Sequence, residues 1–224
     1  FPFQRHKQWL AKPVGVGIND AHGLISRLDQ GPSLCEMMSF CRLRSFPFHA
    51  SPPESSDIAQ FQLGTTKSFL SDLNVDPRGY EYYLRETSNT IEKQAQKTRR
   101  MIRDLGPLRF EFDCRDPRML ERLIELKCDQ YTRTHTYRIL GVPWIQQLLR
   151  NMHADTHAPA RGVLNVLFAG EMPVALHFGI LEGDLLHYWF PVFDPAAGFG
   201  SPGTQLFLEV AREARERGIV AVDM

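Results

Sequence analysis

One stretch of the sequence, residues 184–224, most constrains what this chain can fold into. An apolar run, Leu185 to Phe193, leads into a loop rich in Pro, Gly and Ser, residues 194–202, and then into a helix-patterned segment that ends at Gly218. With the apolar residues Ile219–Val222 beyond it, this order predicts strand, loop, helix and strand. Small residues at the start of the helix let a phosphate approach its unpaired amides. The stretch is a candidate anion site, and an ordinary crossover helix is the alternative.

Local signals mark both ends of this predicted helix. Ser201 is a residue type that caps helix starts, and Pro202 suits a first helical position because its missing N–H needs no partner. Gly218 follows as a stop signal. Between these ends, apolar residues recur at three- and four-residue spacing, which predicts one buried face and one solvated face. These apolar residues are Leu206, Phe207, Val210, Ala211 and Ala214.

The remaining sequence alternates between strand and helix patterns, which predicts an α+β chain. We expect a strand hairpin within residues 1–16 and two helices within 80–105 that meet at Ser88-Asn89. In chain order, the other expected elements are a helix over 32–38, strands over 40–48 and 108–112, helices over 116–131 and 143–152, and strands over 163–168, 172–181 and 184–193.

Charge and composition exclude several classes of protein. Lys+Arg and Asp+Glu both number 26, so no global field attracts DNA or an anionic membrane. No run approaches the ~18 apolar residues of a membrane span. The cysteines (Cys35, Cys41, Cys114 and Cys128) form no C-x-x-C pair and are typical of thiols in a reducing compartment. We therefore expect a cytoplasmic protein with no DNA partner and no membrane insertion.

Two pairs of side chains are candidates for proton transfer. Asp20 and His22 lie in a glycine-rich turn, where a carboxylate can tune an imidazole as a proton acceptor. An Asx-type turn with an exposed histidine is the alternative for this pair. If Glu182-Gly183 is a two-residue hairpin turn, the register places His177 opposite Tyr188 on one sheet face. For these two residues, a buried hydrogen bond in the core is the alternative.

Basic residues gather in the second half of segment 80–105, namely Lys93, Lys97, Arg99, Arg100 and Arg103. A phosphate-rich acceptor or a tRNA can bind such a face, although a solvated helix offset by Glu92 and Asp104 explains it equally. His153 and His157 have metal-ligand spacing, but no third ligand is apparent near this helix end. We therefore expect no metal site.

Several short motifs of this chain resemble those of the GNAT-type acyltransferases. They are Pro173-Val174-Ala175, His187-Tyr188-Trp189, Asp194-Pro195, Ser201-Pro202-Gly203-Thr204-Gln205-Leu206, Glu216-Arg217-Gly218 and Val222-Asp223. Within the GNAT proteins, Pro13-Val14-Gly15 and Asp20-Ala21-His22-Gly23 resemble the first half of the CelD-like group, which is associated with bacterial cellulose and exopolysaccharide synthesis. The resemblance spans nearly the whole chain.

This resemblance implies a GNAT-like mixed sheet flanked by helices, in two tandem halves as in the related Fem-type fold. Residues 1–76 would form an N-terminal half that lacks its start, and residues 77–106 would form connecting helices. Residues 107–224 would form the C-terminal acyltransferase half without its last strands. No internal sequence repeat is visible between the two halves.

The resemblance also implies direct acyl transfer from acyl-coenzyme A to an amine or a sugar hydroxyl. The thioester would lie along the strand at Pro191, Val192 and Phe193, and the pyrophosphate would meet Ser201, Pro202, Gly203, Thr204 and Gln205. The proton of the acceptor would pass to His22, Asp20 or His177. Tyr188 would lie beside His177 and take part in the same proton transfer.

One departure from the family pattern leaves other functions open. GNAT enzymes carry Gln/Arg-x-x-Gly-x-Gly/Ala at the pyrophosphate, and aligning its last glycine on Gly203 places Gly198 and Ser201 at the first and middle positions. A Fem-like transferase that uses aminoacyl-tRNA is therefore one alternative. A non-catalytic GNAT-fold binding protein is another, because a fold alone does not establish an activity.

Overall fold

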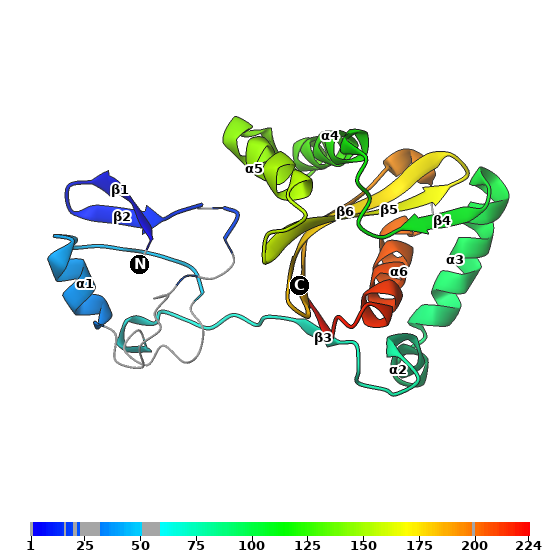
Figure 1. Cartoon of the computed structure of the whole chain (residues 1–224), viewed down its shortest axis with the longest axis horizontal. Coiled ribbons are helices and arrows are strands. Elements are labelled where there is room, and N and C mark those ends of the chain that lie inside the picture. The colour runs from blue at the N-terminus through cyan, green and yellow to red at the C-terminus, as the bar shows by residue number, and fades with distance from the viewer. Residues whose placement is uncertain (1, 16, 20–21, 23–31, 51–58, 199) are drawn as a thin grey trace. The chain divides into compact units, whose positions relative to one another are not determined.

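The computed structural model of this chain describes residues 2–15, 17–19, 22, 32–50, 59–198 and 200–224. The chain divides into two compact units, Phe1–Lys67 and Ser68–Met224. Figure 1 shows the elements of each unit. None of the helices within the described ranges is both long enough and apolar enough to cross a membrane.

The first unit contains a small hairpin and a short helix. Strands β1 (Phe3–Lys7) and β2 (Leu10–Pro13) pair antiparallel, which confirms the predicted hairpin. Helix α1 (Leu34–Phe40) begins two residues later than predicted, with a capping box formed by Ser33 and Glu36. This box satisfies amides that the first turn would otherwise leave unpaired.

The strand predicted over residues 40–48 is wrong, because these residues form only one isolated bridge, between Leu10 and Ser45. Leu43 and Phe46 are buried with Ala11 in a small core instead. Apolar burial, and not a strand ladder, therefore holds this segment. A 3-10 turn, η1 (Ala59–Phe61), follows in the same unit.

The second unit is built on a six-stranded mixed sheet (Figure 1), with the strand order β3-β8-β7-β6-β5-β4. The strands are β3 (Leu70–Asp72), β4 (Leu108–Glu111), β5 (Ala160–Ala169), β6 (Met172–Glu182), β7 (Leu185–Phe193) and β8 (Ala221–Asp223). Strands β7 and β8 run parallel, and every other neighbouring pair is antiparallel. The predicted meander of three successive strands is confirmed as β5, β6 and β7.

Helices cover both faces of this sheet (Figure 1). Helix α6 (Pro202–Glu216) lies on one face, with α2 (Tyr80–Thr87) and α3 (Thr90–Leu105) packed against it. Helices α4 (Pro117–Arg133) and α5 (Pro143–Ala154) lie on the other. The short turns η2 (Ile139–Gly141) and η3 (Pro195–Ala197) precede α5 and α6. The predicted α+β class, with a mixed sheet flanked by helices, is confirmed.

The predicted apolar face of α6 forms much of the core of this unit. Leu206, Val210 and Ala214 are buried against the sheet, where they meet Leu186 of β7 and Val222 of β8. Because the chain enters α6 from the end of β7, this packing fixes the start of the helix beside that strand end.

Strands β6 and β7 pair in a register that differs from the predicted one. Glu182 lies opposite Leu185, so the turn falls one residue later than expected. A β-bulge further along shifts the register again, and His177 lies opposite Pro191. The prediction that His177 lies opposite Tyr188 is therefore wrong. The later turn moves the partner of His177 by two positions, and the extra residue of the bulge moves it by one more.

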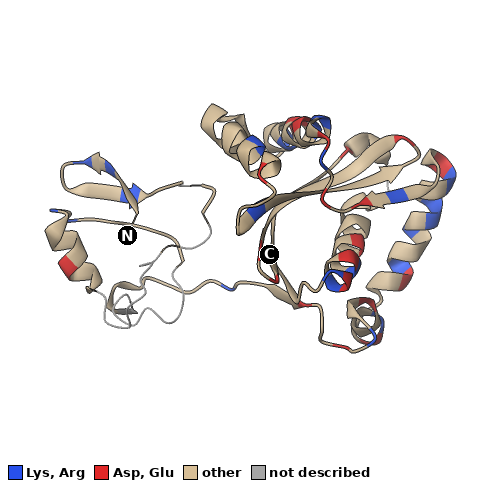
Figure 2. Ribbon diagram, in the orientation of Figure 1, with Lys and Arg blue, Asp and Glu red and all other residues tan. Residues whose placement is uncertain are grey.

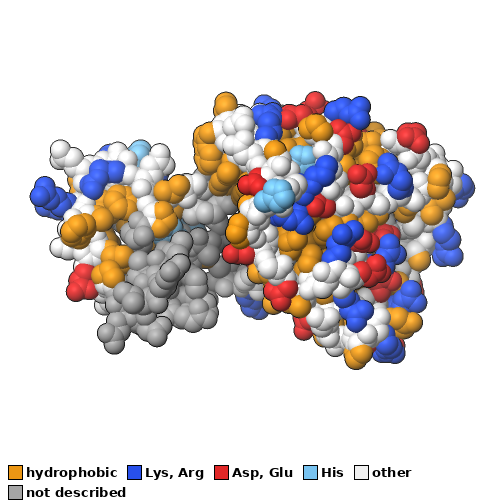
Figure 3. All heavy atoms as spheres, viewed as in Figure 1, with side chains coloured by type: hydrophobic (Ala, Val, Ile, Leu, Met, Phe, Trp, Pro, Cys, Tyr) orange, Lys and Arg blue, Asp and Glu red, His pale blue; other side chains and the backbone are white. Residues whose placement is uncertain are grey.

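Charged side chains of both signs are mixed over the face of the second unit in Figure 3. Figure 2 shows a different pattern along α3, where Lys and Arg predominate. The predicted basic helix is thus exposed, with Lys93, Lys97, Arg99, Arg100 and Arg103 on its surface. Arg100 and Arg103 both pair with Asp104.

Candidate functional site

The start of α6 differs from an ordinary capped helix. Ser201 stands at the N-cap position, but its backbone is left-handed (φ 47°, ψ 56°) and its side chain makes no capping hydrogen bond. The predicted capping role of the side chain is therefore wrong. The Ser201 hydroxyl instead accepts a hydrogen bond from Lys97 Nζ of α3, at 2.8 Å. A cation from a distant part of the sequence thus stands at the mouth of this helix.

The first-turn amides divide into two kinds. Those of Thr204 and Gln205 donate to the Ser201 carbonyl at 3.1 and 3.3 Å, and Pro202 has no N–H. Helix geometry leaves the amide of Gly203 without an intrahelical acceptor. Among the residues proposed for the pyrophosphate, Gly203 is therefore the main backbone donor of the first turn.

Helix α3 holds the loop before α6 through side chains that are not charged. Gln94 Nε2 donates to the Gly200 carbonyl at 3.2 Å, and Thr98 Oγ1 donates to Gln205 Oε1 at 2.7 Å. A Cβ at Gly200 would lie only 3.1 Å from the Met101 side chain, so a larger residue there would require Met101 to shift. Contacts from α3 therefore position both the loop and the start of α6.

A hollow of about 170 Å³ lies between α3 and the loop that follows β7. Its walls are formed by Arg100, Met101, Asp104 and Leu105 of α3 and by Ala196, Ala197, Gly198 and Gly200 of the loop. The loop side contributes only backbone and methyl groups, which lets a ligand approach the main chain closely.

The end of β7 lies directly beside this helix start. A Cβ at Gly203 would meet only Phe193 Cδ1, at 4.0 Å. Within β7, Pro191 has no N–H, and its carbonyl oxygen accepts a hydrogen bond from Lys127 Nζ of α4 at 2.7 Å. Burial lowers the pKa of Lys127. Of the three β7 residues proposed for the thioester, Pro191 therefore contributes no backbone donor.

His177 and Tyr188 do meet, although not as opposite residues. Their rings stack with centroids 3.8 Å apart. His177 is fully buried, and its Nδ1 lies 3.0 Å from Nδ2 of Asn165, whose Oδ1 accepts from the Asp113 amide. The Asn165 amide thus donates to Nδ1, which places the imidazole proton on Nε2. Burial holds the pKa of His177 well below 6.5, so the ring is neutral.

The histidine of β7, His187, was named from the sequence only as part of a family motif and not as a site residue. His187 lies opposite Asp223 in the parallel pair of β7 and β8, with Nδ1 3.3 Å from Asp223 Oδ2. Strand alternation could have found this pair, because Leu186 and Val222 face the core and their neighbours must face the other way. What the sequence could not show was the register of two strands separated by a helix.

His22 belongs to the first unit and is packed into it. Its ring packs against those of Phe46 and Phe48, with centroids 5.0 and 5.3 Å away, and these two rings also contact each other. Burial lowers the pKa of His22. Asp20, its proposed partner, lies outside the described residues, so the pairing stays a prediction.

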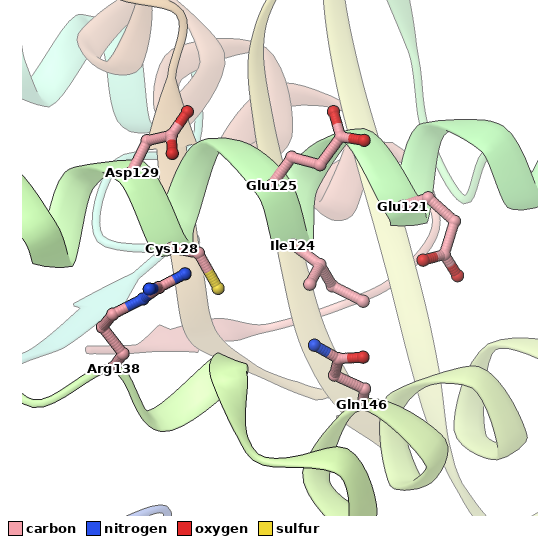
Figure 4. Close-up of a pocket in the computed structure, with 7 residues that line it drawn as sticks. All are labelled: Glu121, Ile124, Glu125, Cys128, Asp129, Arg138 and Gln146. Atoms are coloured by element: carbon pink, nitrogen blue, oxygen red, sulfur yellow. The ribbon is translucent and has the colours of Figure 1, made fainter.

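A larger hollow of about 410 Å³ lies between α4 and the segment that leads into α5. Figure 4 shows Glu121, Glu125 and Asp129 projecting from α4, with Arg138 and Gln146 across the gap. No three potential metal ligands come together among the described residues. The ring Nε2 of His153 bonds the Cys114 carbonyl at 2.8 Å, which is a structural contact.

The sequence from residue 89 to residue 224, more than half of the chain, matches the family model described as an acetyltransferase (GNAT) domain. The chain belongs to the GNAT acetyltransferase family. The match begins where α3 begins and runs to β8. Residues 1–76 lie before the matched part of this GNAT chain, so a GNAT-like N-terminal half stays a prediction. No curated protein matches the sequence.

The chain is similar to two solved structures. The C-terminal domain of a protein provisionally assigned as a lysylphosphatidylglycerol synthetase, from Agrobacterium fabrum, has a TM-score of 0.53 and 17% identity to the GNAT chain, and the similarity covers 84% of this chain and 56% of that one. A conserved protein of unknown function from Bacteroides thetaiotaomicron has a TM-score of 0.46 and 10% identity, over 70% and 49%. The GNAT chain thus spans only about half the length of these structures, and the likeness to the first extends to the fold alone.

Proposed function

We propose that this GNAT chain transfers an acyl group from acyl-coenzyme A to an amine or a hydroxyl group of a small-molecule or saccharide acceptor. One observation carries the proposal: Gly203, in the first turn of α6, lies beside Phe193 at the end of β7. A diphosphate at the helix start and a thioester arm along the strand would therefore occupy adjoining positions.

The residues at the helix start fit a diphosphate. The N-terminus of α6 carries partial positive charge, and the glycines at 198 and 203 leave its approach open. Where the family pattern has Gln or Arg, this chain has Gly198, which offers no side chain. Lys97 of α3, bound to the Ser201 hydroxyl, supplies a cation there instead. This contact offsets the departure from the family motif.

The reaction requires the protein to orient the donor and the acceptor, and it requires no covalent enzyme intermediate. The acceptor's nitrogen or oxygen bonds to the acyl carbon, the carbon–sulfur bond breaks, and the thiolate takes a proton to leave as free coenzyme A. Holding both reactants in position and polarising the carbonyl are sufficient to lower the barrier for such a transfer.

The resemblance to the CelD-like group extends the proposal to a pathway. On this basis the acceptor belongs to bacterial cellulose or exopolysaccharide synthesis, and the transfer takes place in the cytoplasm. The mixture of both charge signs on the surface in Figure 3 is compatible with a small saccharide acceptor.

A second candidate is aminoacyl transfer from aminoacyl-tRNA, as in the Fem-type enzymes. Two observations favour it: the exposed cations of α3, and the name of the Agrobacterium fabrum structure, a lysylphosphatidylglycerol synthetase. Binding of tRNA through α3 would weaken steeply with salt, because each phosphate contact releases counterions. A non-catalytic binding role is the third candidate.

Calorimetric titration with acetyl-coenzyme A separates these candidates. We expect saturable binding that is lost in Gly203→Trp, because an indole there blocks the helix mouth. The glycine has no positive φ and a Cβ there meets no close atom, so the variant is expected to fold. Gly64→Trp is the matched control, because a Cβ at Gly64 meets nothing within 4 Å.

The other outcomes decide between the alternatives. Binding of tRNA without binding of acetyl-coenzyme A favours the aminoacyl transferase. Failure of the intact protein to bind either one rejects both enzymes and leaves the non-catalytic role. Equal binding by wild type and Gly203→Trp rejects the proposed diphosphate position.

A further inference from the structure

We propose that His187, oriented by Asp223, accepts the proton of the acceptor during acyl transfer, a role that rests on the proposed function above. The two residues pair in register across the parallel strands β7 and β8, and His187 Nδ1 lies 3.3 Å from Asp223 Oδ2. Both side chains are reachable from solvent, with exposed fractions of 22% and 32%.

The carboxylate fixes which imidazole nitrogen can act as the base. An ionised carboxylate only accepts hydrogen bonds, so Nδ1 must carry the proton when it faces Asp223. In the neutral ring the lone pair is then on Nε2. The other carboxylate oxygen, Oδ1, accepts from the Ser68 hydroxyl at 3.2 Å, which holds the carboxylate in place.

The position of His187 along β7 suits the reacting end of the donor. Gly203 places the diphosphate at the Phe193 end of the strand, so the thioester arm would run back along β7 toward its start. A strand rises about 3.3 Å per residue, which puts His187 about 20 Å from Phe193. The bulge of β7, where Tyr188 and Trp189 lie opposite Gly179 of β6, follows His187 directly. The dyad therefore lies on the strand along which an arm anchored at α6 would run.

The other histidines considered above are poorly placed for this work. His177 is fully buried, and Asn165 already donates to its Nδ1. His153 is buried against the Cys114 carbonyl. Of the histidines described in the second unit, His187 is the one whose ring nitrogen meets a carboxylate within 4.0 Å.

The proton balance of the step is simple. Nε2 takes one proton from the acceptor's amine or hydroxyl as its nitrogen or oxygen bonds to the acyl carbon. The carbon–sulfur bond then breaks, and the imidazolium returns that proton to the departing thiolate. Asp223 stabilises the imidazolium in between and is itself not protonated. Among the groups near His187 are the Asp223 carboxylate of β8, Ile180 opposite it on β6 and the Trp189 ring, whose centroid lies 6.2 Å away.

The experiment measures acetyl-coenzyme A binding by calorimetry and thiol release in the presence of water, ethanolamine, glucosamine or glycerol. The variants are His187→Gln, His187→Ala and Asp223→Asn, and the control is His157→Gln, an exposed histidine of the same unit. Circular dichroism checks that each variant folds. General base catalysis contributes roughly 100-fold or more, so we expect His187→Gln to lose at least about 100-fold in kcat with acetyl-coenzyme A binding unchanged.

Two further readouts separate catalysis from structure. The rising limb of the wild-type pH–rate profile should disappear in His187→Gln, and added 4-methylimidazole should restore part of the rate of His187→Ala. Asp223→Asn should lower kcat without weakening acetyl-coenzyme A binding, and it tests the dyad even if the His187 variants fail to fold.

Each contrary result has a distinct meaning. If His187→Gln keeps the wild-type kcat and pH profile, the role of the dyad is overturned while the transferase stands. If the His187 variants do not fold, the same result for Asp223→Asn overturns the role of the dyad. If the intact protein neither binds acetyl-coenzyme A nor releases thiol from it, the proposed function fails, and the role of His187 fails with it.

Discussion

The ammonium of Lys127 lies 2.7 Å from the carbonyl oxygen of Pro191 and so joins α4 to the middle of β7. No carboxylate lies within 4.0 Å of this ammonium among the described residues, and the Tyr131 ring lies 5.5 Å away. A half-buried cation held only by a carbonyl and an aromatic ring is costly to charge. The cation lies beside the strand on which the thioester arm is proposed.

Lys127 should therefore titrate at an unusually low pH. Burial disfavours the charged form, so we expect the ε-carbon NMR resonance of Lys127 to shift below pH 10.5, the ordinary value for lysine. Lys127→Gln identifies the resonance by its disappearance. A midpoint at or above 10.5 would show that the ammonium is solvated.

Gly179→Ala should destabilise the second unit. A Cβ at this position of β6, opposite the bulge of β7, collides with the His187 carbonyl oxygen and lies 2.7 Å from the His177 ring. Overpacking of this kind costs about 1–3 kcal/mol, and denaturant unfolding measures it. Gly64→Ala, where a Cβ meets nothing within 4 Å, is the control and should stay close to wild type. Equal stability of the two variants would contradict the described bulge.

The stability of the second unit should depend on the protonation of His177. Folding lowers the pKa of this residue, so below about pH 6.5 the unfolded chain binds a proton that the folded chain does not. The contribution of the neutral His177 ring to the free energy of unfolding is fully present above pH 6.5. As the pH falls below this value, the free energy of unfolding decreases by up to about 1.4 kcal/mol per pH unit. Denaturant unfolding at several pH values checks this. His177→Gln should have a shallower slope, and an unchanged slope would reject a buried neutral ring.

Lys97→Ala should weaken acetyl-coenzyme A binding about tenfold, which corresponds to the loss of one charge-assisted contact. The reason is that Lys97 Nζ stands at the Ser201 hydroxyl, beside the proposed diphosphate. Lys93→Ala, one turn earlier on α3, is the matched control and should bind as wild type. Calorimetry measures both constants, and equal weakening would point to general charge attraction instead.

The sequence predicted most elements of the second unit because their periodic patterns are long and well bounded. The strand order, however, depends on contacts between distant residues. Lys97 and Ser201 are 104 positions apart, and no local pattern could bring α3 to the start of α6. The candidate diphosphate site could therefore be located from sequence, while its cation could not.

The failures have equally specific causes. Gly179, inside a predicted strand, was a signal for a nearby bulge. This overlooked bulge and the later turn together displaced the expected partner of His177. In segment 40–48 the apolar residues suggested a strand, but they fill a small core without pairing. Tyr188, one of the two residues of the bulge, stacks its ring on His177.

Strand β3 pairs with β8, so the second unit joins residues 70–72 to residues 221–223. During synthesis on the ribosome, β3 emerges long before β8. Until β8 is made, the strand edge of β3 that will bind β8 stays unpaired. Such a distant pairing is slow to form because the intervening chain must first be brought together. The closing of this sheet is therefore a late event, and it also brings Asp223 to His187.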